Sequence, residues 1–399
     1  MIESIVLFCR ATPHHHIGGM ETVAWSLATE WAKTVGDVRL VTTAIPGAAQ
    51  PFTAEAVSVV PLPNTRPGRY SRAWWQESRE YWLAQRVAPS VVFSVSAGAY
   101  AVVRERSRHP GTPFVLQAHG TSAMEIRSKL RAPGLRSLAG VAAKNAPSLL
   151  RDLSRYGDFD SIIAVAESVS ESLAAKPLKW SVPPDRIRLI PNGVRIAEHG
   201  FDALARDKTR AALGIDDRVK VVACAGRLHI QKRVDRALRA AAVLRDRGHA
   251  DRFRFLLVGD GPDETRLRGL AGDLQLDGMV RFVGRVPREE VRDYYAASDA
   301  ALLTTGWIEG LPMTMLEALA CGLPCLVPTG MAGSLAQRTS VHEVDATSPD
   351  LLADALYEVT RVPRPRVSLL PRELHLEHCA QAYLTVFEEL RSSPRAEHG

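Results

Sequence analysis

Two basic side chains directly follow a predicted strand in the second half of the chain. The strand spans 219–226, and Arg227 and Lys232 come after it in the stretch CAGRLHIQK. Charge-assisted hydrogen bonds from such cations to an anion contribute about 1.5–3 kcal/mol each. Because open parallel sheets bind ligands beyond the carboxyl ends of their strands, we expect the pair to neutralise a diphosphate. Arg233 and Arg236, which follow, are expected to be ordinary surface residues.

A second anion-binding element is predicted where a helix begins at Pro312. Proline suits the first turn because its missing N–H costs nothing there, and Gly322 suits the C-terminal end. The unpaired N–H groups of Leu311, Met313 and Thr314 are expected to face an anion, with the positive end of the helix dipole behind them.

Two carboxylates belong to the same segment. Glu309 lies just before the predicted helix, and Glu317 lies about a turn and a half inside it. An ionised carboxylate only accepts hydrogen bonds, so each suits paired sugar hydroxyls such as a ribose diol or a hexose. The alternative for both is an ordinary surface charge in contact with solvent.

Short apolar runs alternate with helical patterns along the chain. The predicted strands span 4–9, 38–43, 56–60, 91–96, 114–119, 161–166 and 187–190 in the first half, and 219–226, 253–259, 280–284, 300–305 and 324–328 in the second. Near-continuous apolar strands between helices imply parallel sheets that are covered on both faces. Two such series predict an α/β fold with two doubly wound, Rossmann-like domains facing a cleft.

The chain of 399 residues is too long for one ordinary core. Prolines and glycines cluster near 183–200, after which the alternation of strands and helices restarts. We therefore expect an N-terminal domain over 1–190, a C-terminal domain over 191–373, a helix over 374–392 that returns to the N-terminal domain, and a tail over 393–399.

Positive charge is concentrated in 104–155, which holds ten Lys and Arg residues against three Asp and Glu, in a chain of net charge +6. This favours an anionic surface or acceptor, with a solvated helical face as the alternative. We expect no nucleic-acid partner because no aromatic platform or reader motif accompanies the charge.

Three features predict a cytoplasmic protein, at most peripheral to the inner face of the membrane. They are the five scattered cysteines, the lack of a basic signal region and the lack of long apolar runs.

Three adjacent histidines, His14, His15 and His16, follow the first predicted strand. They cannot share one face as ligands at i,i+4 spacing would, and no cysteine or carboxylate partner is evident nearby. We expect a solvated loop, with the acceptor entrance as the alternative.

Asp158 and Asp160 precede a strand and should lie at its amino end, so we predict no metal site.

Several motifs together resemble a known family. GRLHIQK (226–232), LLVGDGP (256–262), VRFVG (280–284) and the Glu309/Glu317 pair are similar to the donor half of retaining GT-B glycosyltransferases of family 4. IPNGVR (190–195) is similar to that family's interdomain segment. The order and spacing of these motifs make the resemblance specific.

The resemblance implies a role for each matched residue in the second half. Arg227 and Lys232 would bind the diphosphate of a UDP- or GDP-type nucleotide sugar. Glu317 would hold the ribose, and Glu309 would contact the donor sugar. The backbone from Gly310 to Thr314, which includes Pro312, would cradle sugar and phosphate.

Other positions are implied more loosely. The nucleobase would lie near Val286, held mainly by backbone groups. Gly18 and Gly19 match a glycine pair whose backbone approaches the diphosphate and the acceptor. His119 follows a strand as the family's active-site histidine does, so it would contact the donor sugar or assist at the acceptor, with a purely structural histidine as the alternative. Arg233 stands where the family usually has glycine, which leaves the local loop shape open.

The implied reaction transfers a sugar from a nucleotide diphosphate donor to an acceptor hydroxyl on a glycan, glycolipid or secondary metabolite. The anomeric configuration would be retained. We expect a front-face route without a covalent nucleophile, and neither a cofactor nor a metal, because cationic side chains would replace the metal. A sugar-nucleotide epimerase or hydrolase on the same fold is the first alternative. A non-catalytic protein that binds anionic membrane is the second.

Overall fold

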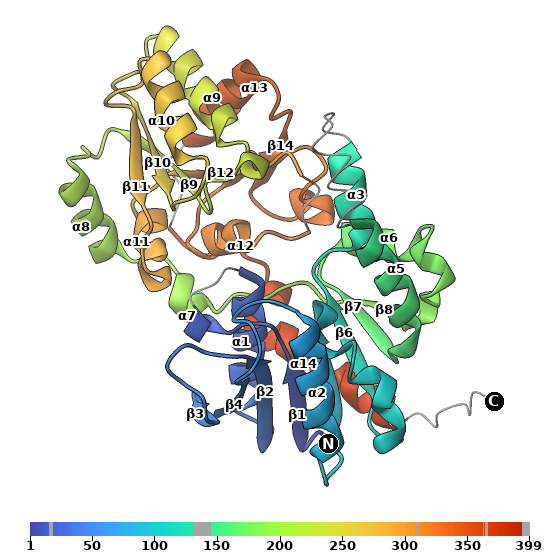
Figure 1. The fold of residues 1–399 in the computed structure, drawn as a ribbon. Helices are drawn as coiled ribbons and strands as arrows, with labels where there is room; N and C mark the ends of the chain where they lie inside the picture. Colours follow the sequence, from blue (N-terminus) through green and yellow to red (C-terminus); the bar gives the residue numbers. More distant parts are fainter. Residues whose placement is uncertain (16–18, 131–144, 308–309, 362, 364–365, 393–399) are drawn as a thin grey trace. The chain divides into compact units, whose positions relative to one another are not determined.

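A computed structural model describes residues 1–15, 19–130, 145–307, 310–361, 363 and 366–392, with backbone alone for 19–21. The chain divides into two compact units (Figure 1). The first comprises Met1–Gly193 together with Leu376–Gly399, and the second comprises Val194–His375.

The first unit is built on a sheet of eight strands in the order β3-β4-β2-β1-β5-β6-β7-β8. The strands are β1 Ser4–Phe8, β2 Asp37–Thr43, β3 Phe52–Ala54, β4 Val57–Leu62, β5 Val91–Val95, β6 Phe114–Ala118, β7 Ser161–Ala164 and β8 Ile187–Leu189. The described helices are α1 Gly19–Trp31, α2 Arg72–Ala84, α3 Ser122–Leu130, α5 Ala146–Arg155, α6 Glu167–Ala174 and α14 Leu376–Ser392. All seven strands predicted for this half are present.

β3 was not predicted, and it pairs antiparallel with β4, so the expectation of a wholly parallel sheet is wrong at this edge. The turn between the two strands holds Glu55 and Ala56, both with positive φ (47° and 63°). Such hairpin turns usually carry Asn or Gly, so the sequence here lacks the usual signal. The Trp25 indole N–H donates to Glu55 Oε1 at 3.2 Å and helps to hold the turn.

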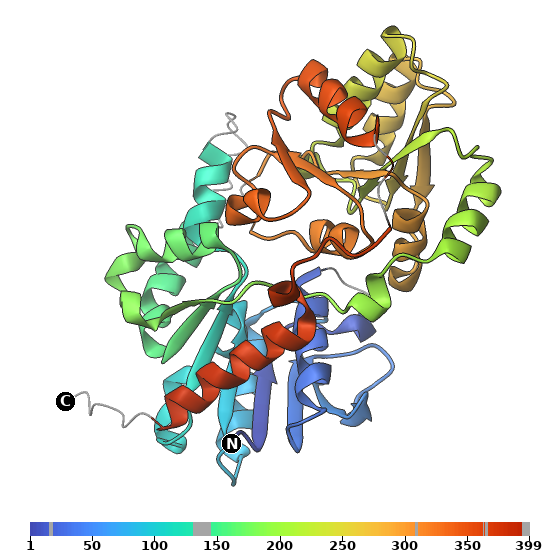
Figure 2. The same cartoon turned by 180° about the vertical axis from the view of Figure 1, so that it is seen from behind.

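The C-terminal helix α14 belongs to the first unit, and Figure 2 shows it lying across one face of the sheet. The ring of Trp31 on α1 contacts Phe93, Tyr383 and Phe387 edge-on, with centroids 5.3–5.7 Å apart. The Trp31 indole N–H also donates to Ala380 O at 3.0 Å. This aromatic cluster fixes α14 against the sheet and α1.

The second unit has six parallel strands in the order β11-β10-β9-β12-β13-β14. The strands are β9 Lys220–Ala225, β10 Phe253–Val258, β11 Val280–Gly284, β12 Ala300–Leu302, β13 Cys325–Pro328 and β14 Val341–Val344. The helices are α7 Ile196–His199, α8 Ala203–Leu213, α9 Val234–Asp246, α10 Glu264–Asp273, α11 Val291–Ala296, α12 Met313–Ala320 and α13 Pro349–Arg361. Counted from β9, this is the 3-2-1-4-5-6 order of a doubly wound Rossmann sheet.

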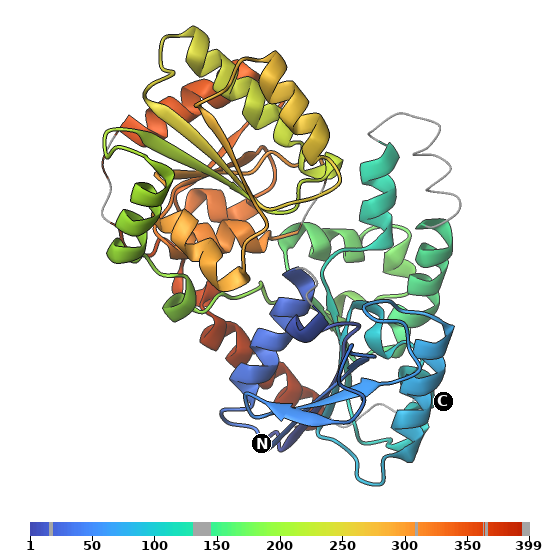
Figure 3. The same ribbon diagram turned by 60° about the vertical axis from the view of Figure 1, so that its left-hand side comes forward.

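Helices cover both faces of the second sheet (Figure 3). One apolar cluster joins the strands to α9, α10 and α13, and another joins them to α11 and α12. Two Rossmann-like domains are thus confirmed. β14 was missed because His342 and Glu343 are exposed at the sheet edge and leave little apolar pattern. Among the described helices, none has the length and apolar character needed to cross a membrane.

Candidate active site

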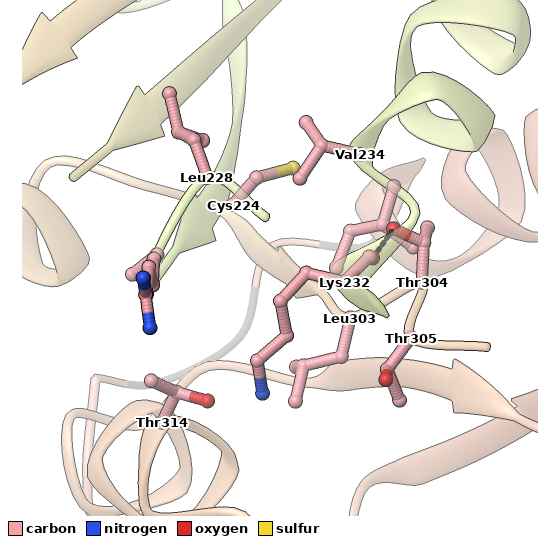
Figure 4. A pocket seen from close by; sticks show the side chains of 12 residues that line it. Cys224, Leu228, Lys232, Val234, Leu303, Thr304, Thr305 and Thr314 are labelled. Carbon is pink, nitrogen blue, oxygen red and sulfur yellow. Dashed lines mark hydrogen bonds between the residues drawn. The ribbon is translucent and has the colours of Figure 1, made fainter. Parts of the chain in front are cut away.

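A pocket opens in the second unit at the carboxyl ends of β9 and β12 (Figure 4). Its walls come from 224–228, Lys232, Val234, 302–305 and Thr314. The strand order reverses between β9 and β12, and open α/β sheets bind ligands at such a switch point.

The pocket brings together three residues that were predicted to bind the donor. Arg227 and Lys232 line it from the loop after β9, and Thr314 lines it from the first turn of α12. Figure 4 shows the Lys232 amine and the Thr314 hydroxyl pointing into the same space. The cations and the helix N-terminus therefore face one small volume, as an anion site requires.

The loop that carries Arg227 rests on the loop after β10. Leu228 N–H donates to Asp260 O at 2.8 Å, and further backbone hydrogen bonds join the two loops. A Cβ on Gly259 would lie 2.2 Å from Gly226 O, and one on Gly261 would lie 2.2 Å from Leu228 O. The glycines of the GDGP motif therefore allow close backbone contact that supports the loop after β9.

Two threonines hold the same loop from the other side. Thr304 Oγ1 donates to Lys232 O at 3.0 Å, and Thr305 Oγ1 donates to Gln231 O at 3.1 Å. The sequence placed both threonines in a strand over 300–305, but β12 ends at Leu302. The sequence does indicate this earlier end of the strand, because two hydroxyl-bearing residues close an otherwise apolar run.

Arg233 is not the ordinary surface residue that was expected. It adopts the left-handed conformation (φ 49°, ψ 42°) at the junction between the loop and α9. Its guanidinium donates twice to the Asp235 carboxylate, with both distances 3.0 Å. This position favours glycine, so the bidentate pair compensates for a strained backbone. The loop keeps the shape that glycine would allow.

The helix that was predicted to begin at Pro312 is present, but it begins one residue later. Pro312 is its N-cap residue, and the first helical residue is Met313. Among the described residues, no acceptor contacts the N–H groups of Leu311, Met313 or Thr314. Such groups have no partner within the helix, and where no side chain caps them they are suited to bind an anion.

Glu317 is buried, so the alternative of a solvated surface charge is wrong for it. Arg288 Nη2 donates to Glu317 Oε1 at 2.6 Å, with side-chain exposures of 43% and 6% respectively. Burial lowers the pKa of nearby His199, while the charge of Glu317 opposes that shift. Arg288 was not predicted. It lies two residues after Val286 and links the expected base segment to the expected ribose ligand.

His119 lies in the first unit, directly after β6, and is half-buried. Its Nε2 is 2.9 Å from Gln117 Oε1. Burial, with a smaller effect of the Arg10 charge, lowers the pKa of His119 to about 4. The imidazole is therefore neutral at physiological pH.

Two other predicted residues, Gly18 and Glu309, lie outside the described residues. Gly19 is the first residue of α1, and Gly310 precedes the N-cap of α12. The roles assigned to these four residues remain predictions.

The expectation of a solvated histidine loop is wrong for His15. Its Nδ1 accepts from Thr12 N–H at 3.0 Å, and its Nε2 lies 3.3 Å from Thr43 O. His14 contacts Trp25 and Phe52 edge-on at 5.4 and 5.3 Å. His15 thus supports the loop after β1, whereas His14 is exposed as expected, and His16 lies outside the described residues.

Part of the basic region is used in local ion pairs. Arg106 Nη2 donates to Asp160 Oδ1 at 2.7 Å, and Asp160 Oδ2 accepts from Phe114 N–H at 2.8 Å. Arg155 Nη1 lies 3.5 Å from Asp158 Oδ2. Residues 131–144 of this region lie outside the described residues. In the described part of the chain, no group of three His, Cys, Asp or Glu side chains could hold a metal ion.

Two Rossmann-like units in one chain, with a pocket at the switch point of the second, are the features of the GT-B class of fold. Two family models match the chain: Glycosyltransferase Family 4 over residues 17–198, and Glycosyl transferases group 1 over residues 205–359. Together they cover most of the sequence. The chain belongs to the GT-B glycosyltransferases of this group 1 and family 4 type.

Individual relatives agree with this membership. The chain is 28% identical over 364 residues to the D-inositol 3-phosphate glycosyltransferase of Corynebacterium efficiens, covering 85% of this chain and 81% of that protein. It is 32% identical over 218 residues to the GDP-mannose-dependent alpha-(1-6)-phosphatidylinositol monomannoside mannosyltransferase of Mycolicibacterium smegmatis, covering 51% and 56%.

Solved structures share the fold at low sequence identity. Sucrose-phosphate synthase from Thermosynechococcus elongatus superposes with a TM-score of 0.77 and 17% identity, over 97% of this chain and 99% of that one. HepE of Anabaena, crystallised with UDP and glucose, gives a TM-score of 0.70 and 14% identity, over 97% and 100%. These similarities establish the fold of the whole chain.

Proposed function

We propose that this glycosyltransferase is a retaining enzyme that transfers a hexose from a UDP- or GDP-type nucleotide sugar to an acceptor hydroxyl. The observation that carries the proposal is the pocket of the second unit, where Arg227 and Lys232 line the same space as the start of α12. The proposal is also supported by a relative whose name specifies GDP-mannose and by a neighbour of the same fold crystallised with UDP.

The proposed chemistry depends on the charge that develops on the leaving diphosphate. Arg227, Lys232 and the N–H groups at the start of α12 would stabilise that charge electrostatically. Because these groups supply positive charge, we propose that transfer needs no metal. Glu309 would contact the donor sugar, and transfer would occur from the front face, without a covalent intermediate.

An incubation series tests the proposed function. UDP-glucose, UDP-galactose, UDP-N-acetylglucosamine and GDP-mannose are each supplied with and without candidate acceptors, in the presence and absence of EDTA. Transfer that requires an acceptor, survives EDTA and yields a product with the donor's anomeric configuration by NMR supports the proposal. Nucleotide release without any acceptor requirement favours a hydrolase or epimerase, and absence of both turnover and donor binding favours a non-catalytic protein.

Glu317→Ala is expected to weaken nucleotide binding about tenfold to a hundredfold, because hydrogen bonds from a ribose diol to a carboxylate are charge-assisted. Calorimetry with UDP and GDP measures the loss. Glu358→Ala, which removes an exposed carboxylate on α13, is the matched control and should have no effect.

The 2′-deoxy nucleotides sharpen this experiment. They should bind the wild type more weakly than the ribonucleotides do, but bind Glu317→Ala about as well as the ribonucleotides do. An unchanged preference for the ribonucleotide in Glu317→Ala would remove the ribose role from this residue.

We also propose peripheral contact with anionic membrane through 104–155. Leu130 and Leu150 are 56% and 68% exposed on α3 and α5, beside Lys129 and Arg151. The protein should sediment with phosphatidylglycerol vesicles at low salt, with binding that fades as salt screens the charges. Phosphatidylcholine vesicles are the control. Failure to bind the anionic vesicles at low salt contradicts the membrane role.

A further inference from the structure

A buried hydrogen-bonded chain connects His119 to the C-terminal helix. Gln117 Nε2 donates to Tyr383 Oη at 2.8 Å, and Gln117 Oε1 lies 2.9 Å from His119 Nε2. Gln117 is the fourth residue of β6, and Tyr383 is on α14. Residues 117 and 119 project from the same face because side chains alternate along an extended chain. All three residues belong to the first unit.

The chemistry of the amide determines which imidazole nitrogen carries the proton. An amide oxygen only accepts hydrogen bonds, so the contact with Gln117 Oε1 requires a proton on His119 Nε2. In a neutral imidazole the other nitrogen, Nδ1, then has a free lone pair. Nδ1 can accept a hydrogen bond from a hydroxyl group, whereas Nε2 cannot.

The tyrosine at the end of the chain is rigidly held. Its side chain is buried and contacts the rings of Trp31 and Phe93 edge-on, with centroids 5.7 and 5.5 Å away. Gln117 is fully buried as well. Hydrogen bonds in such apolar surroundings are stronger than in water, so these two contacts hold the Gln117 amide with Nε2 toward Tyr383 and Oε1 toward His119.

We propose that Gln117 and Tyr383 are positioning residues, which hold His119 in the Nε2–H tautomer so that Nδ1 accepts a hydrogen bond from a hydroxyl of the reacting sugars. This inference rests on the proposed glycosyl transfer and on the prediction, implied by the family resemblance, that His119 contacts the donor sugar or assists at the acceptor. It makes the C-terminal helix part of the catalytic apparatus, through a residue more than 250 positions from the histidine it orients.

The first test measures the tautomer directly. Long-range ¹H–¹⁵N spectra of ¹⁵N-histidine-labelled protein should show His119 protonated at Nε2 in the wild type. Gln117→Leu, which has a similar volume but no acceptor, should shift His119 toward a mixture of both tautomers. Tyr383→Phe should produce a smaller shift. Phe387→Leu changes packing in the same cluster without touching the network and should leave the tautomer unchanged.

The second test links the tautomer to turnover. Gln117→Leu should lower kcat about threefold to tenfold, the factor that one neutral hydrogen bond contributes. In a His119→Ala background the same change should have no further effect, because the residue it orients is gone. An equal loss in both backgrounds, an unchanged tautomer in Gln117→Leu, or the same losses in Phe387→Leu would overturn the inference.

The outcome for His119→Ala separates this inference from the proposed function. Full activity of His119→Ala would reject the positioning role while leaving the glycosyltransferase proposal intact. If the wild type turns over no donor, the proposed function fails, and the spectra still decide whether Gln117 controls the tautomer.

Discussion

Lys232→Ala should lower kcat/KM for sugar transfer by about a hundredfold or more. Lys232 lines the pocket at the end of β9, opposite the first turn of α12. A cation placed where charge develops in the transition state contributes more to the rate than to ground-state binding. Nucleotide affinity should therefore fall less than turnover does. Steady-state kinetics with the active donor, together with calorimetry of the nucleotide, separate the two effects.

Lys208→Ala is the matched control for this prediction. Lys208 is exposed on α8 of the same unit, and its removal changes the net charge equally. Near-normal turnover in Lys232→Ala, or an equal loss in Lys208→Ala, would exclude a specific phosphate role for Lys232.

Gly259→Ala should destabilise the protein by roughly 2–4 kcal/mol, the combined scale of overpacking and backbone strain. The new methyl group would lie 2.2 Å from Gly226 O, and Gly259 has a φ of 133° that side chains rarely adopt. The loop that carries Arg227 would have to move. Urea unfolding measures the stability, and nucleotide calorimetry should show weaker binding in the protein that remains folded.

Gly269→Ala makes the same chemical change where the structure has room. Gly269 is on α10, and no atom lies within 4 Å of its added Cβ. This variant should be more stable by about 0.5–1 kcal/mol, because alanine favours a helix interior over glycine. Equal stability changes in the two variants would show that the contact between the two loops is unimportant.

Much of the fold could be predicted because its signals are local. Every predicted strand is present, since apolar runs between helical patterns mark strands of a buried parallel sheet. The two missed strands carry weak signals: β3 is joined to β4 by a turn that lacks Asn and Gly, and β14 is an exposed edge. The end of β12 was misplaced because Thr304 favours a strand by composition, whereas its hydroxyl contacts the neighbouring loop.

Part of the candidate site could be predicted. A residue that directly follows a strand or begins a helix has a known place at the edge of the sheet. Arg227, Lys232 and Thr314 meet in the pocket for this reason. Arg288 could not be predicted as the partner of Glu317, because 29 residues separate them and their contact depends on how the turn before α11, and α11 itself, pack against α12. The role of Arg233 also needed the structure, which shows its left-handed backbone and its pairing with Asp235.

The sequence by itself determined the two Rossmann-like domains, their family and the basic residues that line the pocket. These follow from periodicity, from composition and from motifs of a few residues, which act over short distances along the chain. Only the tertiary structure decided which neighbours contact the candidate site residues: Arg288 for Glu317, the GDGP glycines for the loop after β9, and Gln117 with Tyr383 for His119. Hydrogen bonds between distant residues depend on the packing of whole elements, and no local pattern encodes that packing.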